Sequence, residues 1–350
     1  MAEIKTKHGL PETKGQFKLR GKATGLQRDK AFQPKTTKTN KKMRILNFGV
    51  ETAPESTVYV TLQGMERDDV YYGKRSEVKG QKGETRKVPW ADRHTPPGEG
   101  FRLMGIGVGL EKGEDGRNVT NTLTEFDAAE EVYNTLNDDE FVFVRGDIEF
   151  SSFKNEKDEV SRNKKFAIKN IYGSNDIDFD AEDFAETSEF KQKIIFMGIQ
   201  KAEDANDPHF IVEAQIVTYG SIEQTEFTVR NNALANQFRK ILKPYTAIEV
   251  WGKIFNKVDT DEVEEASGAV WGEEDSFKKV TKNYIRELMI VGADPETIDT
   301  ETYTEESIEK AIKKLNSQGQ VEKKKEQKKE SASDSWGEGS SDIQDDDLPW

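Results

Sequence analysis

The stretch NALANQFRKILKPYTAIEVWGKIFNKV, residues 232–258, joins two different periodicities in one short segment. Its first half places apolar residues at helical spacing, and its second half alternates apolar and polar residues as a strand does. In that strand Ile248, Val250 and Ile254 share one face, so Trp251 and Phe255 lie on the other. Outward aromatic residues separated by lysine are difficult to explain as core, although each could still pack against a neighbouring element.

The segments around this stretch predict a small barrel. Residues 191–200, 209–220 and 222–230 alternate like strands before the helix, and residues 283–293 form one more strand after it. Three strands, a helix and two strands is the order of the OB-fold, a five-stranded Greek-key barrel. We therefore expect an OB-fold over residues 190–293.

An earlier segment repeats this order less cleanly. Residues 43–175 predict a first OB-fold with a long insertion at 64–100, and Thr124 precedes Asp127 at the spacing of a helix cap. The strand FVFVRGDIEF, residues 141–150, aligns with IEVWGKIFNK, residues 248–257, and each has Arg or Trp directly before a glycine. Such a glycine usually marks a bulge or a close backbone approach. The fold class is accordingly mainly β with two OB-fold domains.

Enzyme motifs are missing from the sequence. It has no phosphate loop, no GxSxG elbow and no HExxH, and GIGVG at residues 105–109 is better explained as a glycine-kinked strand than as a dinucleotide fingerprint. Cysteine is absent and the three histidines are scattered, so we expect no metal, no cofactor and no enzymatic activity. Acidic clusters such as EDFAE and GEED leave a divalent cation, and hence a nuclease, as a weaker alternative.

Charge is distributed unevenly along the chain. Its net charge is −14, which taken alone argues against a polyanionic partner. Residues 1–42, however, carry twelve basic and three acidic side chains with little apolar periodicity, which predicts a disordered basic arm that attracts phosphates. A solubilising leader is the alternative. Residues 71–93 of the insertion hold seven basic and three acidic residues with two tyrosines and a tryptophan, and predict a mobile loop that folds over a nucleic acid strand.

Basic and aromatic side chains together suit single-stranded nucleic acid, because any base can stack on a ring while cations follow the phosphates. In the strand at 141–150 the predicted inward residues are Val142, Val144, Ile148 and Phe150. The candidate residues for binding single-stranded DNA are Tyr71, Tyr72, Lys74, Arg75, Arg86, Lys87, Trp90, Arg93, Phe143, Arg145, Lys165, Lys169, Trp251, Lys253, Phe255 and Lys257.

The last part of the chain predicts a short helix over residues 294–320, with Ile308, Ala311 and Leu315 at helical spacing, and then a charged linker and acidic tail over 321–350. The tail ends DDDLPW, which are Asp345, Asp346, Asp347, Leu348, Pro349 and Trp350. This ending, with the barrel, linker and tail layout, resembles bacterial and bacteriophage single-stranded DNA-binding proteins. The resemblance implies that the tip docks replication and repair proteins. The final Trp in place of Phe, the basic arm and the second barrel depart from the bacterial pattern and favour a phage-encoded version.

The sequence thus predicts sequence-independent binding of single-stranded DNA in replication, recombination or repair. Two alternatives stay open: an OB-fold adaptor or loader that binds proteins, and an OB-fold protein that binds RNA. Without an apolar run long enough to span a membrane, and without the apolar core of a signal peptide, we expect no membrane partner and a cytoplasmic location, in the host cytoplasm if the protein is phage-encoded.

Overall fold

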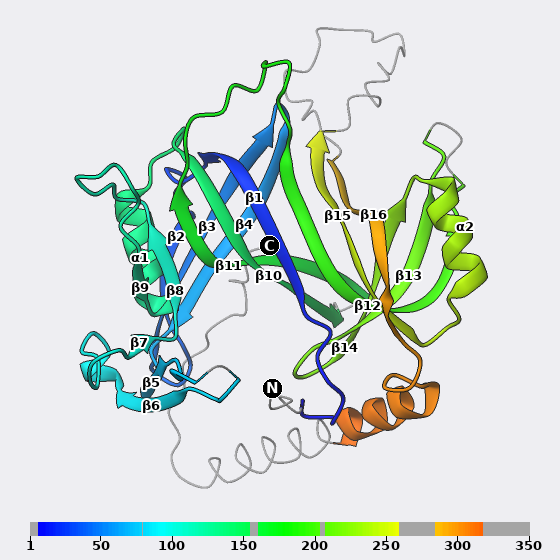
Figure 1. Cartoon of the computed structure of the whole chain (residues 1–350), viewed down its shortest axis with the longest axis horizontal. Helices are drawn as coiled ribbons and strands as arrows, with labels where there is room; N and C mark the ends of the chain where they lie inside the picture. The colour runs from blue at the N-terminus through cyan, green and yellow to red at the C-terminus, as the bar shows by residue number, and fades with distance from the viewer. Residues whose placement is uncertain (1–5, 79, 155–159, 204–206, 259–283, 318–350) are drawn as a thin grey trace, which may run out of the picture.

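The computed structural model describes residues 6–78, 80–154, 160–203, 207–258 and 284–317. This part of the chain is mainly β, and most of its strands belong to one sheet of 13 strands (Figure 1). The sheet closes on itself twice, which produces two barrels.

The first barrel is a closed ring of five strands. β1 (Gly15–Thr24) pairs with β3 (Lys42–Ala53), β3 with β4 (Ser56–Met65), β4 with β11 (Val160–Gly173), β11 with β10 (Phe141–Lys154), and β10 again with β1. The pairing of β4 with β11 is parallel and the other four are antiparallel. Closure of this kind removes exposed strand edges.

The second barrel repeats this order. β12 (Thr187–Lys201) pairs with β13 (Phe210–Val217), β13 with β14 (Ile222–Val229), β14 with β16 (Tyr284–Asp299), β16 with β15 (Thr246–Val258), and β15 again with β12. Here too only the pairing of the third strand with the fifth is parallel.

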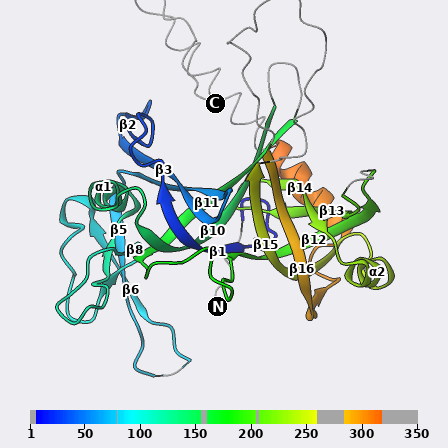
Figure 2. The ribbon, with the colours of Figure 1, turned by 90° about the horizontal axis from the view of Figure 1, so that it is seen from above.

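Each barrel has one α-helix between its third and fourth strands, α1 (Glu125–Thr135) in the first and α2 (Asn232–Ile241) in the second. The predicted cap of α1 is confirmed, because the Thr124 hydroxyl accepts a hydrogen bond from the Asp127 backbone N–H at 3.1 Å. The Asn231 side chain caps α2 in the same way through two backbone N–H groups. Figures 1 and 2 show the two helices at opposite ends of the molecule, with β1 between them.

The barrels are joined through their first strands. β1 runs antiparallel to β12 over residues 15–20, and Phe17 lies opposite Phe190 in this pairing. Both rings are buried, and one apolar cluster contains core residues of both barrels. The two barrels therefore share a continuous core instead of packing as separate domains.

The alternation that predicted inward residues is confirmed in both fourth strands. These side chains are at most 7% exposed: Val142, Val144, Ile148 and Phe150 in β10, and Ile248, Val250 and Ile254 in β15. Burying their apolar surface at about 25 cal/mol per Å² is the main favourable term for such a core.

Residues between β4 and β10 form further strands. β5 (Asp69–Lys74), β6 (Glu84–Pro89) and β7 (Arg102–Leu103) make a separate three-stranded sheet, with the short 3-10 helix η1 (Trp90–Asp92) after β6. β8 (Ile106–Gly109) and β9 (Asn121–Leu123) also lie in this interval and belong to the large sheet. The remaining strand of that sheet, β2 (Phe32–Thr36), lies between β1 and β3. The GIGVG segment is a strand, as predicted, because β8 pairs with β9 and β11.

The segment before β1 and a helix over residues 305–317 both pack on the second barrel. Leu10 from the first, Ile308 from the second and Tyr303, just before the helix, join a cluster with Ile195 and other barrel residues. The Tyr303 hydroxyl also donates to the Pro11 carbonyl at 3.2 Å. Within the described residues, no helix is both long and apolar enough to cross a membrane.

Two predicted boundaries are wrong. Residues 1–42 are not a disordered arm throughout, because they contain β1 and β2, and the first barrel begins at Gly15 instead of residue 43. Phe17 and Leu19 alternate with an exposed lysine and a half-buried arginine in β1, so the strand pattern was present beneath the basic composition. The expected helix over 294–320 is shorter, since β16 extends to Asp299; the linker and tail at 321–350 lie outside the described residues.

Candidate functional site

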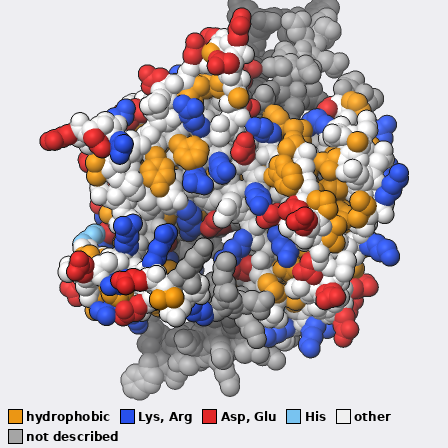
Figure 3. Space-filling model, viewed as in Figure 1, with side chains coloured by type: hydrophobic (Ala, Val, Ile, Leu, Met, Phe, Trp, Pro, Cys, Tyr) orange, Lys and Arg blue, Asp and Glu red, His pale blue; other side chains and the backbone are white. Residues whose placement is uncertain are grey.

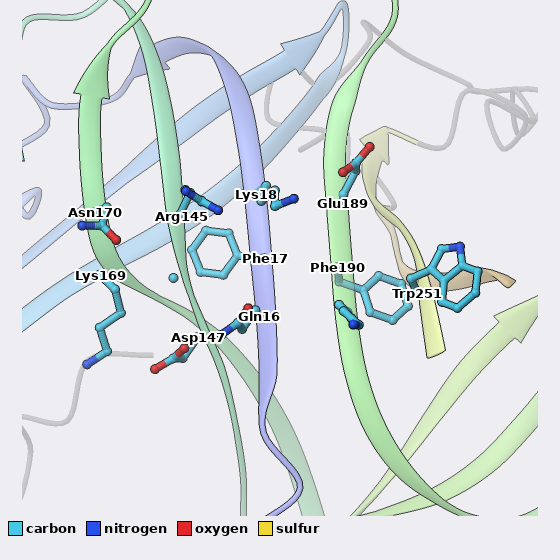
Figure 4. Close-up of a pocket in the computed structure, with 12 residues that line it drawn as sticks. Gln16, Phe17, Lys18, Arg145, Asp147, Lys169, Asn170, Glu189, Phe190 and Trp251 are labelled. Atoms are coloured by element: carbon cyan, nitrogen blue, oxygen red, sulfur yellow. The ribbon is translucent and has the colours of Figure 1, made fainter. Parts of the chain in front are cut away.

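A groove crosses the junction of the two barrels. It has a volume of about 590 Å³ and is lined by residues 16–18 of β1, 145–147 of β10, 169–170 of β11, 189–191 of β12, and Trp251 of β15 (Figure 4). We call it the junction groove. Its walls come from both barrels, so it exists only because β1 pairs with β12.

Two glycines make room for aromatic rings in the floor of the groove. A Cβ at Gly146 would lie 2.7 Å from Cε1 of Phe17, and one at Gly252 would lie 2.9 Å from Cε1 of Phe190. Both glycines sit at register shifts of their strands, where a bulge brings the backbone close to its neighbour. The sequence predicted that these glycines permit a bulge or a close backbone approach, and this role is confirmed.

Three cations of the groove have no ion-pair partner among the described residues: Lys18, Arg145 and Lys169. The Arg145 guanidinium lies 5.8 Å from the ring of Phe143. In contrast, Lys191 is 2.7 Å from a Glu249 carboxylate oxygen. Unpaired cations in a concave surface raise the local concentration of anions.

Trp251 provides an exposed aromatic surface beside these cations. Its side chain is 41% exposed, and a Cβ at Gly292 would lie 2.5 Å from its Cε2 and Cζ2 atoms. The indole therefore rests on the β16 backbone at Gly292, where no side chain separates them. A ring held in this way loses little conformational freedom when a second ring stacks on it.

Basic side chains outnumber acidic ones in the strand segments around the groove, and two of the basic ones, Lys22 and Lys193, pair with Asp139 and Asp299 outside these segments. Residues 18–22, 143–147, 169, 187–193 and 249–253 carry eight basic and three acidic side chains. Blue side chains extend across the middle of the molecule in Figure 3, with orange ones and some red ones between them. The basic members are Lys18, Arg20, Lys22, Arg145, Lys169, Lys191, Lys193 and Lys253, and the acidic ones are Asp147, Glu189 and Glu249. We call this surface the junction face.

The structure brings five of the predicted binding residues to the junction face. Arg145, Lys169 and Trp251 line the groove itself. Phe143 is half-buried next to Arg145, and Lys253 donates a hydrogen bond to the Glu186 carbonyl at 2.9 Å. Lys165 does not join them, since it pairs with Glu149 at 3.0 Å beside another cavity.

Phe255 lies in a second groove of about 500 Å³, between β4, β11, β15 and β16. Tyr59 and Phe166 line the same groove together with Lys164. Burial lowers the pKa of Lys164, and the charges of nearby glutamates offset only part of that effect. Lys257 is a β15 residue whose side chain lies outside the described part of the structure.

The insertion is an ordered sheet fastened to α1, and the prediction of a mobile loop is wrong for its strands. Arg93 donates two hydrogen bonds to the Asp127 carboxylate, at 2.8 and 3.1 Å. The Trp90 ring lies 5.9 Å from that of Phe126, edge to face. Burial alone would raise the pKa of Asp127, but hydrogen bonds from Arg93 and Thr124 outweigh it and leave the pKa below its ordinary value.

Several predicted insertion residues are engaged within this small sheet. Tyr72 is 3% exposed and donates its hydroxyl to the Arg93 carbonyl at 2.7 Å, so it offers no face for stacking and its prediction is wrong. Lys87 pairs with Asp69 at 2.7 Å. The Lys74 and Arg86 side chains lie 6.0 and 4.5 Å from the ring of Phe101, whereas Tyr71 and Arg75 are exposed. In Figure 1 this sheet is at the lower left, beside α1.

Sequence reasoning missed Lys18, Lys191 and Gly292. The first two belong to the triplets QFK in β1 and EFK in β12, whose shared pattern was a usable signal. Gly292 could not be recognised, because its role depends on the pairing of β15 with β16. The predicted tail residues at 345–350 lie outside the described residues, and among those described no group of three or more His, Cys, Asp or Glu side chains could hold a metal ion.

Comparison with known proteins identifies the family. The model of the YorF family matches residues 75–333, well over half of the chain. The chain belongs to the YorF family. The match begins between β5 and β6 of this YorF chain and so leaves out the strands from β1 to β5. No curated protein matches the sequence.

Two solved structures are similar to the YorF chain at low identity. One is the wild-type single-stranded DNA binding protein from Thermus aquaticus, with 11% identity, a TM-score of 0.38, and coverage of 81% of this chain and 93% of that chain. The other is a deletion mutant of the same protein, with 12% identity, a TM-score of 0.39, and coverage of 81% and 94%.

Proposed function

We propose that the chain binds single-stranded DNA without sequence preference and holds it in the junction groove. One observation carries the proposal: Lys18, Arg145 and Lys169, which lack ion-pair partners among the described residues, share a groove with the exposed indole of Trp251. Stacking on an aromatic side chain contributes about 1–3 kcal/mol per base whatever the base is, and cations follow the phosphates. Neither interaction reads the edges of the bases, which accounts for the absence of sequence preference.

The strand order supports the same proposal. We infer that both barrels are OB-folds, because each closes five strands in one order and has its helix between the third and fourth strands. OB-folds commonly bind oligonucleotides. Fold alone does not determine function, so the groove and its charges carry the greater weight.

The proposal extends to the role of the chain in the cell. We expect a non-enzymatic protein, of the bacteriophage type, that covers unpaired DNA in the cytoplasm during replication, recombination or repair. The DDDLPW ending at residues 345–350 supports recruitment of replication proteins through the tail. An apolar tip on an acidic lead suits a pocket rimmed with basic residues.

Fluorescence titration with oligo(dT) tests the binding proposal. We expect quenching that is reversed by salt, and a loss of about 5- to 150-fold in affinity for Trp251→Ala, which corresponds to one stacked base. Tyr133→Ala is the matched control, because Tyr133 is 40% exposed on α1, away from the groove. Equal affinities of the two variants would contradict a stacking role for Trp251.

The cations are tested by the salt dependence of the same titration. Arg145→Ala with Lys169→Ala should lower the slope of log K against log salt by about 1.4, since each neutralised phosphate of a single strand contributes about 0.7. Lys240→Ala with Lys243→Ala removes two exposed lysines at the end of α2 and should leave the slope unchanged. The proposal fails if the full-length chain does not bind oligo(dT), or if it degrades labelled DNA with magnesium.

A further inference from the structure

The two halves of the junction groove are related by an approximate two-fold axis. In the antiparallel pairing of β1 with β12, Phe17 lies opposite Phe190. Phe17 in turn lies opposite Gly146 of β10, and Phe190 opposite Gly252 of β15. A rotation of 180° about the Phe17–Phe190 pair therefore exchanges the two barrels and maps the groove onto itself.

This rotation pairs residues of different chemistry. Arg145 and Trp251 occupy equivalent positions, each directly before the bulged glycine. On the neighbouring strand, Arg145 is paired with Asn170 of β11, and Trp251 is paired with Gly292 of β16. The first-barrel half of the groove thus presents a guanidinium where the second-barrel half presents an indole.

The environments of these two side chains strengthen the difference. Trp251 lies over Gly292, which has no side chain. Asn170 holds the equivalent position in the first barrel, and its side chain fills the space that an indole would need there. Lys169 lines the first-barrel half, whereas the residue before Gly292 is the exposed and uncharged Val291. Figure 4 shows Arg145, Lys169 and Asn170 on one side of the two phenylalanines and Trp251 on the other.

We propose that single-stranded DNA crosses this axis in one direction only, with its phosphates on the first barrel and a base stacked on Trp251 of the second. The inference rests on the proposed function. A groove with an exact two-fold axis would hold a strand equally well in both directions, because the rotation exchanges the 5′ and 3′ sides. The exchange of Arg145 for Trp251 removes this equivalence, since a base and its phosphate lie in a fixed order along the strand.

Cross-linking from the two ends of a short oligonucleotide tests the direction. Two octamers of thymidine carry a single 5-iododeoxyuridine, one at the 5′ end and the other at the 3′ end, and each is irradiated with the full-length chain. We expect the yield at Trp251, measured by mass spectrometry of the tryptic peptides, to differ at least fivefold between the two octamers, which is the lower bound for one stacked base.

A variant that exchanges the two chemistries tests the cause. Arg145→Trp, Asn170→Gly and Trp251→Arg together move the indole and its glycine seat to the first barrel without changing the net charge. Cross-linking should then move to position 145 and keep the wild-type preference for one end of the octamer, because the strand turns round together with the indole. Gly292→Val, which displaces the indole from its seat, should reduce cross-linking at Trp251 from both ends.

The outcomes separate this inference from the proposed function. Equal yields from the two ends of the wild-type complex, with oligo(dT) still bound, would overturn the single direction and leave DNA binding intact. Absence of any complex would instead overturn the proposed function. If the exchanged variant binds oligo(dT) but cross-links at position 145 from the opposite end, the strand has kept its wild-type direction across the barrels. Arg145 and Trp251 then do not set that direction and the inference is wrong. The wild-type comparison needs no variant, so the test does not depend on whether the exchanged chain folds.

Discussion

Replacement of Gly252 by alanine should destabilise the chain far more than an ordinary glycine substitution. A Cβ at this position would lie 1.8 Å from the Met289 carbonyl oxygen and 2.9 Å from Cε1 of Phe190. The first of these atoms belongs to the backbone of β16, so a rotamer change cannot relieve the contact. Overpacking of this kind costs about 1–3 kcal/mol, and displacement of a strand backbone places the expected loss toward the upper end of that range.

Gly220→Ala is the matched control for this prediction. Nothing lies within 4 Å of a Cβ at Gly220, so alanine there should be neutral or stabilising by up to about 1 kcal/mol. Gly146→Ala is the equivalent change in the first barrel, because its Cβ would lie 1.9 Å from the Ala167 carbonyl oxygen. If the two barrels use their glycines alike, both barrel variants should lose similar stability.

Urea unfolding followed by circular dichroism gives the required free energies of unfolding. We expect both barrel variants to unfold at lower urea concentration than Gly220→Ala, and their thermal midpoints to fall by about 2–4 °C for each kcal/mol lost. A midpoint for Gly252→Ala that coincides with that of Gly220→Ala would show that β16 yields at this contact. The argument for a rigid bulge would then be refuted.

Three further predictions concern the insertion, the terminal helix and the tail. Asp127→Asn should lower the free energy of unfolding by about 1–3 kcal/mol through weaker bonds to Arg93. Because the pKa of Asp127 is depressed in the folded state, this difference should be fully present above pH 3.8 and vanish as the pH falls through the lower folded value. Ile308→Ala should cost about 2–5 kcal/mol, whereas Ile312→Ala, at a 39% exposed position of the same helix, should cost under about 0.5 kcal/mol by thermal unfolding. Deletion of residues 331–350 should tighten oligo(dT) binding at low salt, because it removes six tethered acidic side chains that compete for the junction face; an unchanged affinity would contradict this competition.

Strand periodicity predicted most of the second barrel and the inward faces of both fourth strands. It succeeded there because alternation and burial coincide, as in Ile248 and Val250 of β15. The exposure of Trp251 followed from the same alternation. These features depend on neighbours within one strand, which a sequence displays directly.

The first strand was missed for a different reason. In β1 the composition of residues 1–42 outweighed the alternation of Phe17 and Leu19 with lysine and arginine, although the alternation was the better guide. The same error affected Tyr72, which shares the buried face of β5 with Val70. Charge describes what a segment attracts, whereas periodicity describes whether it can pack, and the two are independent.

The junction groove itself could not have been predicted from either barrel alone. Its residues come from five strands, and they meet only because the pairing of β1 with β12 sets Phe17 opposite Phe190. A shift of one residue in this register would turn every side chain of one strand to the opposite face. Lys18 or Lys191, depending on which strand shifts, would then enter the core, so the burial of both phenylalanines fixes the register and with it the composition of the groove.

The net charge of −14 is compatible with a polyanionic partner because of how the charges are arranged. At physiological ionic strength the Debye length is about 8 Å, so a phosphate in the groove interacts mainly with the side chains of the junction face. Eight of those side chains are basic and three are acidic. At low salt the screening length grows to about 30 Å at 0.01 M, and the acidic remainder of the chain then also acts on the strand. As the salt concentration falls below about 0.05 M, the affinity for single-stranded DNA should therefore rise less steeply than counterion release alone implies. Deletion of residues 331–350 should make this rise steeper.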